Sequence, residues 1–197
     1  RMVLQNPRVD LAVLEVARGG ILREGLGYDR NDVAVVTNVA ADHLGIRGID
    51  TVEQLADVKA VIVEAVPRDG VAVLNADDPL VRRMRRRCSG DIVWFSIAAP
   101  GSRVREFIDD HCRRGGRAIV LEPTDRGDMI VIRHGRRSMQ LAWTHLLPAT
   151  LGGTAMFNVA NAMAAAGAAF ALGTGLHEIR QGLRTFSTSY YLSPGRM

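Results

Sequence analysis

Short runs of apolar, mostly β-branched residues that alternate with helical patterns constrain the fold of this chain most strongly. Residues 9–14 (VDLAVL) and 33–38 (VAVVTN) are apolar over most of their length. Such runs are typical of parallel strands that are covered on both faces. Residues 51–66 then carry apolar side chains at helical spacing, and residues 71–74 form another apolar run. This alternation predicts an α/β fold with a mostly parallel sheet and helices on both of its faces.

Local signals indicate where several of these elements begin. Thr51 and Gln54 have the spacing of a capping box. Pro79 occupies a favoured first position of an arginine-rich helix. A further strand is expected at residues 92–95, followed by a helix over about 104–114.

The second half of the chain has a different pattern. Three short β segments are expected at residues 118–121, 129–133 and 138–143. Because Gly127 and Gly135 mark turns between them, these segments predict a hairpin or a small antiparallel patch. Residues 155–172 are rich in alanine, which lets a helix approach its neighbours closely, and residues 176–186 carry a second amphipathic helical pattern.

The composition fits a protein with a substantial core. The chain has 197 residues, of which 47% are hydrophobic and 23% charged, as in one domain or one domain with a small appendage. No stretch approaches the roughly 20 apolar residues of a membrane span, and no signal-peptide pattern precedes the first elements. Cys88 and Cys112 fit no metal-binding spacing, so we expect reduced thiols and a cytoplasmic protein.

Positive charge is concentrated in one run. The net charge is +4, and residues 82–87 contain Arg82, Arg83, Arg85, Arg86 and Arg87. A basic run can bind a polyanion or form the solvated face of a helix. Because no aromatic side chains interleave with it, we favour the solvated face and do not expect nucleic acid as a partner.

Lys59 is the only lysine, since 24 of the 25 basic residues are arginine. A primary amine can lose its proton when buried and can then be covalently modified, whereas a guanidinium group stays charged. An isolated lysine is often an ordinary surface residue. However, Lys59 lies on or beside the apolar stripe of the helix expected at residues 51–66, where a free cation would be unfavourable.

Polar residues follow the first two expected strands. They are Glu15, Thr37, Asn38, Asp42 and His43. Ligands of open α/β sheets bind beyond the carboxyl ends of the strands, so a carboxylate, an imidazole and a modifiable amine converging there could hold a divalent metal ion. Each has an ordinary alternative, because a lone histidine is commonly structural or solvated and Gly19-Gly20 can be a simple turn.

Together these residues resemble the motifs of the central ATP-binding domain of the Mur ligase superfamily. Residues 37–45 followed by Lys59 are similar to its TN…DHL…K signature. The other matching segments are 73–79 (VLNADDP, its LNxDDP), 157–162 (FNVANA, its HNxxNxxAA with Phe157 in place of His) and 194–196 (PGR). Residues 15–26 (EVARGGILREGL) resemble a stretch of the cyanophycin synthetases, which belong to that superfamily. This stretch differs from the corresponding segment of peptidoglycan and folate ligases. No motif matches between about residues 96 and 150.

The resemblance implies a P-loop NTPase-like fold of the Mur ligase central-domain type and an ATP-dependent ligase activity. In this superfamily the γ-phosphate of ATP is transferred to a carboxylate, and an amine then attacks the acyl phosphate. In cyanophycin synthetases the carboxylate is a side chain of an aspartate polymer and the amine is the α-amine of arginine. ATP and Mg²⁺ are therefore the implied cofactors, because Mg²⁺ neutralises the charge of the phosphoryl oxygens.

The same resemblance assigns roles to individual residues. Glu15 and His43 would each bind Mg²⁺, and Lys59 would be carbamylated by CO₂ and become an anionic metal ligand. The implied nucleotide-binding residues are Asn75, Asn158, Asn161 and Arg196. The implied substrate residues are Asp42, Thr37, Asn38 and Arg18. Arg18 and Arg23 would orient the acidic polymer, or would instead pair with Asp29 or Asp32.

The chain departs from the superfamily in one respect. A P-loop, GxxxxGK[ST], needs a lysine before Ser or Thr, and Lys59 precedes Ala60. Both ends of the sequence read as interrupted, so we expect residues 1–197 to be part of a longer polypeptide with an upstream P-loop. That polypeptide would also carry ATP-grasp and C-terminal ligase domains, and we expect a homo-oligomer. The part alone would be inactive and would bind ATP weakly.

Two other interpretations remain open at this point. The chain could belong to another Mur-type ligase, for peptidoglycan or folylpolyglutamate synthesis. Alternatively, it could be a non-catalytic module for assembly or for polyanion binding through the Arg82–Arg87 helix.

Overall fold

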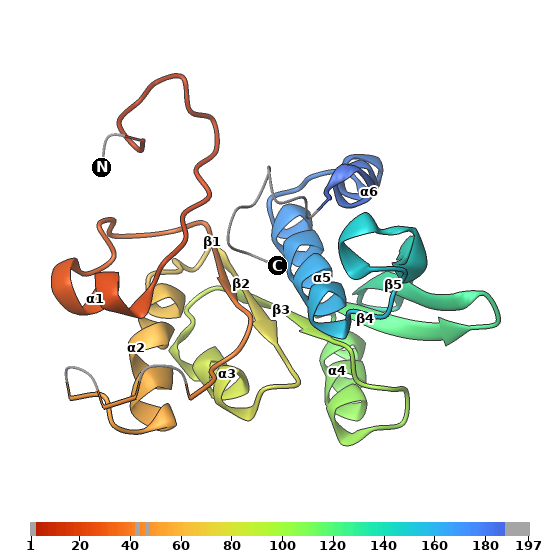
Figure 1. Ribbon diagram of the computed structural model, residues 1–197, viewed down its shortest axis with the longest axis horizontal. Coiled ribbons are helices and arrows are strands. Elements are labelled where there is room, and N and C mark those ends of the chain that lie inside the picture. The colour runs from red at the N-terminus through yellow and green to blue at the C-terminus, as the bar shows by residue number, and fades with distance from the viewer. Residues whose placement is uncertain (1–2, 42–43, 46–47, 188–197) are drawn as a thin grey trace.

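A six-stranded mixed sheet forms the centre of the molecule (Figure 1). The computed structural model describes residues 3–41, 44–45 and 48–187. The strands are β1 (Val33–Val36), β2 (Val71–Asn75), β3 (Asp91–Ser96), β4 (Arg117–Thr124), β5 (Gly127–His134) and β6 (Arg137–Trp143), and they lie in this order across the sheet. β1 to β4 are parallel, whereas β5 and β6 are antiparallel to their neighbours. The predicted antiparallel patch is confirmed, and it continues the main sheet.

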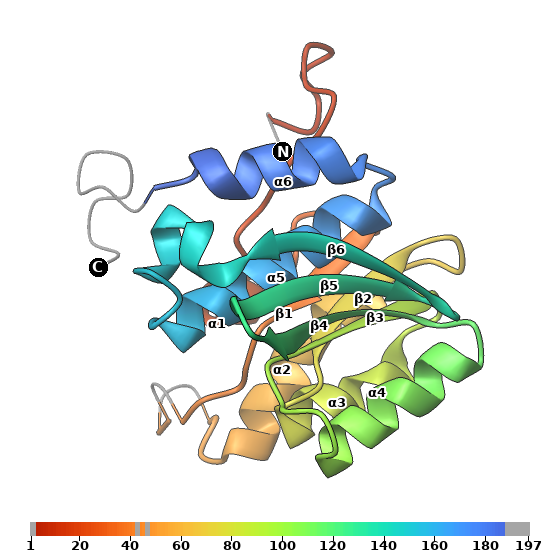
Figure 2. The same cartoon turned by 90° about the vertical axis from the view of Figure 1, so that its right-hand side faces the viewer.

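Helices cover both faces of the sheet, as predicted (Figure 2). On one face lie α2 (Val52–Glu64), α3 (Pro79–Met84) and α4 (Arg103–Arg113); on the other lie α5 (Met156–Ala171) and α6 (Leu176–Thr185). Successive residues of a strand point to opposite faces, so Ala72 and Leu74 join the first core and Val71 and Val73 join the second. Both layers are therefore needed to bury the nearly continuous apolar strands.

The predicted helix starts have the expected capping interactions. The Thr51 hydroxyl accepts from Gln54 N at 3.2 Å, and Gln54 Oε1 accepts from Thr51 N at 3.1 Å. Asp78 caps α3, and Pro79 is its first residue. After Met84 the arginine run tightens into a 3₁₀ helix, η1 (Arg85–Arg87).

The small residues of α5 bring this helix close to the sheet. A Cβ atom on Gly167 would lie 2.8 Å from Val73 Cγ1, closer than normal contact allows. Two short 3₁₀ helices, η2 (Thr144–Leu146) and η3 (Pro148–Thr150), lead from β6 into α5. Among the helices of residues 3–41, 44–45 and 48–187, none combines the length and the apolar character needed to cross a bilayer.

The prediction of a strand at residues 9–14 is wrong. These residues form an irregular segment that runs away from the sheet (Figure 1), with the Val13 side chain 90% and the Leu11 side chain 60% exposed. A strand needs a neighbouring backbone to pair with as well as an apolar pattern, and among the described strands β1 pairs only with β2. A helix that the sequence did not predict, α1 (Arg18–Glu24), follows this segment. Gly19 and Gly20 lie within the helix and do not form the simple turn that their sequence also allows.

Candidate functional site at the carboxyl edge of the sheet

The carboxyl ends of β1 and β2 bring several predicted site residues together. Thr37 and Asn38 directly follow β1, Asn75 ends β2, and Lys59 lies on α2. Because β1 and β2 are parallel, their carboxyl ends meet at one edge of the sheet. The structure thus places these residues at the edge where the strand order predicts a ligand.

The amine of Lys59 points to the end of β1. Its Nζ donates a hydrogen bond to the carbonyl oxygen of Asn38 at 3.2 Å, and the side chain is half-buried. The single lysine is therefore held against the segment that carries the predicted ligands. Its carbamylation stays a prediction.

Side chains of the LNADDP segment hold the end of β1 in place. Asn75 Nδ2 donates to the Thr37 carbonyl oxygen at 2.8 Å, and Asp78 Oδ2 accepts from Val39 N at 2.7 Å. Val39 N and the carbonyl of Asn38 belong to the same peptide group. This peptide group therefore donates its N–H to Asp78 and accepts from Lys59 through its oxygen. By holding the peptide group, Asp78 also fixes the carbonyl oxygen that positions the Lys59 amine.

Asp77 makes the corresponding link to β3. Its two oxygens accept from Ser96 Oγ at 2.5 Å and from Ile97 N at 2.9 Å. Its own N–H donates to Asn75 Oδ1 at 2.9 Å. The predicted nucleotide-binding role of Asn75 stays a prediction. Both the nitrogen and the oxygen of its side-chain amide form hydrogen bonds within the protein, to Thr37 and Asp77 respectively.

The sequence had assigned no role to Asp77 or Asp78. The signal that identifies Asp78 is its position before Pro79, because aspartate is a favoured N-cap and proline a favoured first helical residue. No comparable local signal indicates that Asp77 would reach β3. Its partners, Ser96 and Ile97, are distant in the sequence.

The other predicted metal and substrate residues are only partly described. Glu15 lies exposed in the irregular segment before α1, and Arg18 is the first residue of α1, which packs against α2. Asp42, His43 and Arg196 lie outside the described residues. Within the described part of the chain, no group of three His, Cys, Asp or Glu residues could hold a metal ion. The described residues do not by themselves form a magnesium site, and the set of Glu15, His43 and Lys59 stays a prediction.

The two predicted nucleotide-binding asparagines of α5 occupy different environments. Asn158 Nδ2 donates to the Ala149 carbonyl oxygen at 2.7 Å and joins α5 to η3, whereas Asn161 is exposed. Phe157, which replaces the histidine of the motif, is 68% exposed. A nucleotide role for both asparagines stays a prediction.

Comparison with known proteins identifies the family to which the chain belongs. The sequence model of the Mur ligase middle domain matches residues 2–169. The chain belongs to this family. It is similar to the cyanophycin synthetases of Crocosphaera subtropica and Synechocystis sp., with 48% and 49% identity over 196 residues. The alignment covers 100% of this chain but only 22% of the length of each of these relatives.

More distant members of the Mur ligase family also match. The UDP-N-acetylmuramoyl-L-alanyl-D-glutamate–2,6-diaminopimelate ligase of Gloeobacter violaceus is 30% identical over 185 residues, which cover 94% of this chain and 32% of that protein. The crystal structure of MurF from Acinetobacter baumannii superposes with a TM-score of 0.52 at 22% identity, over 81% of this chain and 30% of that one. The structural likeness confirms the predicted fold.

Proposed function

We propose that the chain is the nucleotide-binding part of an ATP-dependent ligase that joins arginine to the side-chain carboxylates of an aspartate polymer. The observation that carries this proposal is the 48–49% identity, over the whole chain, to proteins named cyanophycin synthetase. The Mur ligase middle-domain match supports the coarser statement of an ATP-dependent ligase. The substrates themselves belong to the proposal.

The proposed reaction has two steps. The polymer carboxylate attacks the γ-phosphorus of ATP, which forms an acyl phosphate and releases ADP. The α-amine of arginine then attacks the acyl carbon, so an amide bond forms, the amine loses a proton and inorganic phosphate leaves. Mg²⁺ would neutralise the negative charge of the phosphoryl oxygens.

Lys59 has a chemical role in this proposal that arginine could not take. The ammonium group first loses a proton to water, and the neutral amine then forms an N–C bond with CO₂ and releases a second proton. The product, NH–COO⁻, is an anion with two oxygens in place of a cation. The modified nitrogen retains one hydrogen, which can still donate to the Asn38 carbonyl. Glu15 and His43 would provide the other metal ligands.

The remaining predicted residues complete the proposal. Asn158, Asn161 and Arg196 would bind the nucleotide. Thr37, Asn38, Asp42 and Arg18 would lie on the side of the acceptor. Partners of the chain would be the ATP-grasp and C-terminal ligase domains of the same polypeptide, within a homo-oligomer.

Residues 1–197 contain no GxxxxGK[ST] motif, which the superfamily uses to bind phosphates. We therefore expect this segment alone to bind ATP weakly and to turn over none. Efficient ATP hydrolysis by residues 1–197 would contradict this part of the proposal. The ligase activity must be tested on the intact protein.

The test of Lys59 uses three variants of the intact protein with arginine and an aspartate polymer as substrates. Lys59→Arg keeps the positive charge and should lower the rate by at least about 100-fold, because a guanidinium group cannot form the carbamate. Lys59→Ala should be equally inactive, but added short carboxylic acids should restore part of its activity by supplying the missing carboxylate. Arg87→Lys in η1 is the control and should retain activity.

Two outcomes would redirect the proposal. An active Lys59→Arg variant would show that a simple cation suffices at this position. Efficient use of UDP-N-acetylmuramoyl peptides with diaminopimelate, in place of arginine and the aspartate polymer, would favour a peptidoglycan ligase, as the Gloeobacter relative suggests.

A further inference from the structure

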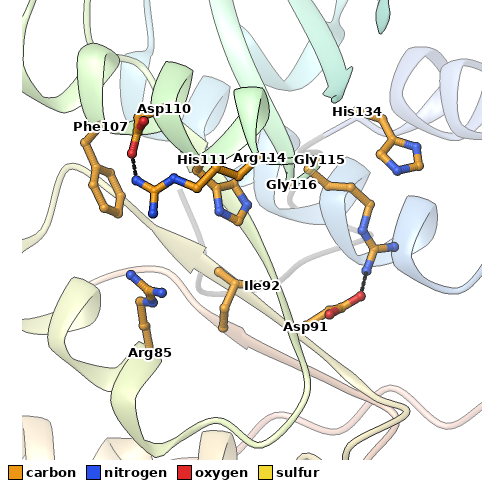
Figure 3. Close-up of a pocket in the computed structure, with 11 residues that line it drawn as sticks. Arg85, Asp91, Ile92, Phe107, Asp110, His111, Arg114, Gly115, Gly116 and His134 are labelled. Carbon is orange, nitrogen blue, oxygen red and sulfur yellow. Dashed lines mark hydrogen bonds and ion pairs between the residues drawn. The ribbon is translucent and has the colours of Figure 1, made fainter. Parts of the chain in front are cut away.

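A hollow lies at the opposite edge of the sheet from Lys59. It has a volume of about 580 Å³ and opens where β3 and β4 begin and β5 ends (Figure 3). Since β3 and β4 are parallel to β1 and β2, their first residues mark the amino edge of the sheet. The hollow is therefore separate from the carboxyl-edge site, and none of the family motifs assigned above contributes a residue to it.

Arginine side chains dominate the charge of this hollow. Its lining includes Arg85 from η1, Arg114 from the end of α4 and Arg117 from the start of β4. Arg114 pairs with Asp110, and Arg117 lies 3.3 Å from Asp91. The guanidinium group of Arg85 makes no ion pair or hydrogen bond with any described residue. Three cations thus face two carboxylates, and Arg85 is the unmatched one.

Arg85 and Arg114 lie at the same end of the hollow, next to Phe107. Figure 3 shows their guanidinium groups on either side of an open space next to Phe107, with the imidazole of His111 beside Arg114. Arg114 is paired with Asp110, whereas Arg85 has no carboxylate partner among the described residues. An anion placed in this space would give Arg85 a counter-charge and would be bound from two directions.

His111 adds an uncharged polar group to the same wall. Its Nε2 is buried without a hydrogen-bond partner in the described part of the chain. The ring packs edge-on against Trp94 with ring centroids 6.4 Å apart. A Cβ atom on Gly116 would lie 2.2 Å from Nε2, so only glycine leaves room for the ring there. A buried polar atom without a protein partner beside the hollow can form a hydrogen bond with a bound group after a small shift of the ring.

We propose that this hollow binds an oxyanion, a phosphate or carboxylate group, between the Arg85 and Arg114 guanidinium groups and next to His111. The planar fork of guanidinium donors matches the oxygen geometry of both groups. The volume of about 580 Å³ exceeds what one such group fills, so the hollow has room for a larger molecule that carries the anion. The proposal concerns only the amino edge and does not depend on the proposed ligase activity.

The test measures binding of two probes to the intact protein by calorimetry. Inorganic phosphate represents a phosphate group, and a tetra-aspartate peptide represents carboxylates on a chain. Arg85→Gln should weaken binding of the preferred probe by about tenfold or more, because a charge-assisted hydrogen bond is lost. Arg86→Gln removes the same charge from the neighbouring residue, which does not line the hollow, and should leave the affinity unchanged.

The outcomes separate the two sources of the anion. Tighter binding of phosphate than of the peptide, lost in Arg85→Gln, assigns the hollow to phosphorylated ligands. The reverse order, lost in the same variant, assigns it to acidic peptides. Equal affinities of Arg85→Gln and Arg86→Gln for both probes would overturn the proposal, as would no saturable binding of either probe at millimolar concentration. Arg85 is exposed, so the variant is expected to fold, which its thermal unfolding would check.

Discussion

The parallel and antiparallel halves of the sheet are joined to their surroundings by different interactions. In the parallel half, the side chains of Asn75, Asp77 and Asp78 bind backbone groups of neighbouring strand ends. In the antiparallel half, which consists of β5, β6 and the end of β4 that pairs only with β5, Arg105 on α4 pairs with Glu122 of β4 and donates to the Leu121 carbonyl at 3.0 Å. In the parallel half, these side chains hold the loops at the edge of the sheet. In the antiparallel half, the arginine side chain holds a helix against a strand.

This difference has a consequence for function. Hydrogen bonds from short side chains to backbone groups fix loop geometry within a small distance range, which suits a site that must place an amine and a peptide carbonyl together. A long arginine side chain can bridge two elements without fixing any loop. The candidate ligase site accordingly lies in the half that is held by short side chains.

The largest predicted effect concerns Arg105, whose side chain is only 4% exposed. Arg105→Ala should lower the free energy of unfolding by about 3 kcal/mol, because it leaves Glu122 and Asp109 without their buried partner. Arg105→Met should lose less, since it retains the apolar stem that packs under the sheet. Urea denaturation of each variant measures the difference.

Arg133 provides the control for this comparison. It also pairs with Asp109, but its side chain is 24% exposed and forms one ion pair, so Arg133→Ala should cost less than about 1 kcal/mol. Equal losses in the Arg105 and Arg133 variants would contradict the view that a buried arginine network holds α4 to the antiparallel half.

A smaller effect is predicted for Asp78 in the parallel half. Asp78→Ala removes both the cap of α3 and the hydrogen bond to Val39 N, so it should lower the free energy of unfolding by about 2 kcal/mol. Ser102→Ala removes only a cap, that of α4, and should cost about 1 kcal/mol. Chemical denaturation again gives both values.

The Asp78→Asn variant separates the two roles of this residue. Its remaining carbonyl oxygen can still cap α3, but its amide group cannot accept from Val39 N. We expect Asp78→Asn to lower the free energy of unfolding by about 1 kcal/mol, less than Asp78→Ala, because it keeps the cap and loses only the bond to Val39 N. The ligase activity of the intact protein should fall as well, because the peptide that binds Lys59 loses its anchor. Normal activity of Asp78→Asn would show that the peptide is held without Asp78.

The sequence predicts the elements of both halves for the same reason. Strands and helices here follow local periodicity and capping signals, such as Thr51 with Gln54 and Pro79, and these depend on neighbours in the chain. Residues 9–14 have the pattern of a strand but no pairing partner among the described strands. Pattern alone therefore identifies which segments can form strands, and the available neighbouring backbone decides which of them do.

The site residues differ in how far the sequence could predict them. The sequence pattern predicts that the amine of Lys59 lies beyond the carboxyl ends of the strands, and the structure places it against the Asn38 carbonyl. The contact of Asp77 with Ser96 and the hollow around Arg85 join segments that are distant in the chain, so no local signal indicates them. Arg87 of the same run pairs with Asp57 at 2.9 Å and Glu64 at 3.2 Å, so tertiary contacts give Arg85 and Arg87 different surroundings although the local sequence is the same.

The smallest predicted effect is a pH dependence at the junction of the two halves, where His111 of α4 faces the start of β3 and β4. Burial lowers the pKa of His111 below the ordinary value of 6.5; the Ile92 and Arg117 carbonyls oppose this shift, and the charges of Arg85 and Arg117 add to it. Below about pH 6.5 the unfolded chain therefore binds a proton at this position that the folded protein does not. Stability should fall as the pH decreases from about 6.5 towards the pKa of the folded state, and this loss is absent above 6.5.

His111→Gln should remove this part of the pH dependence, while His134→Gln, at an exposed histidine that lines the same hollow, should leave it in place. The measurement is the unfolding free energy between pH 5 and 7.5. Phosphate sharpens the comparison, because an anion beside His111 would favour its protonated form and reduce the loss of stability at low pH. An identical pH profile of the wild-type protein and His111→Gln would show that the junction is not held by a neutral histidine.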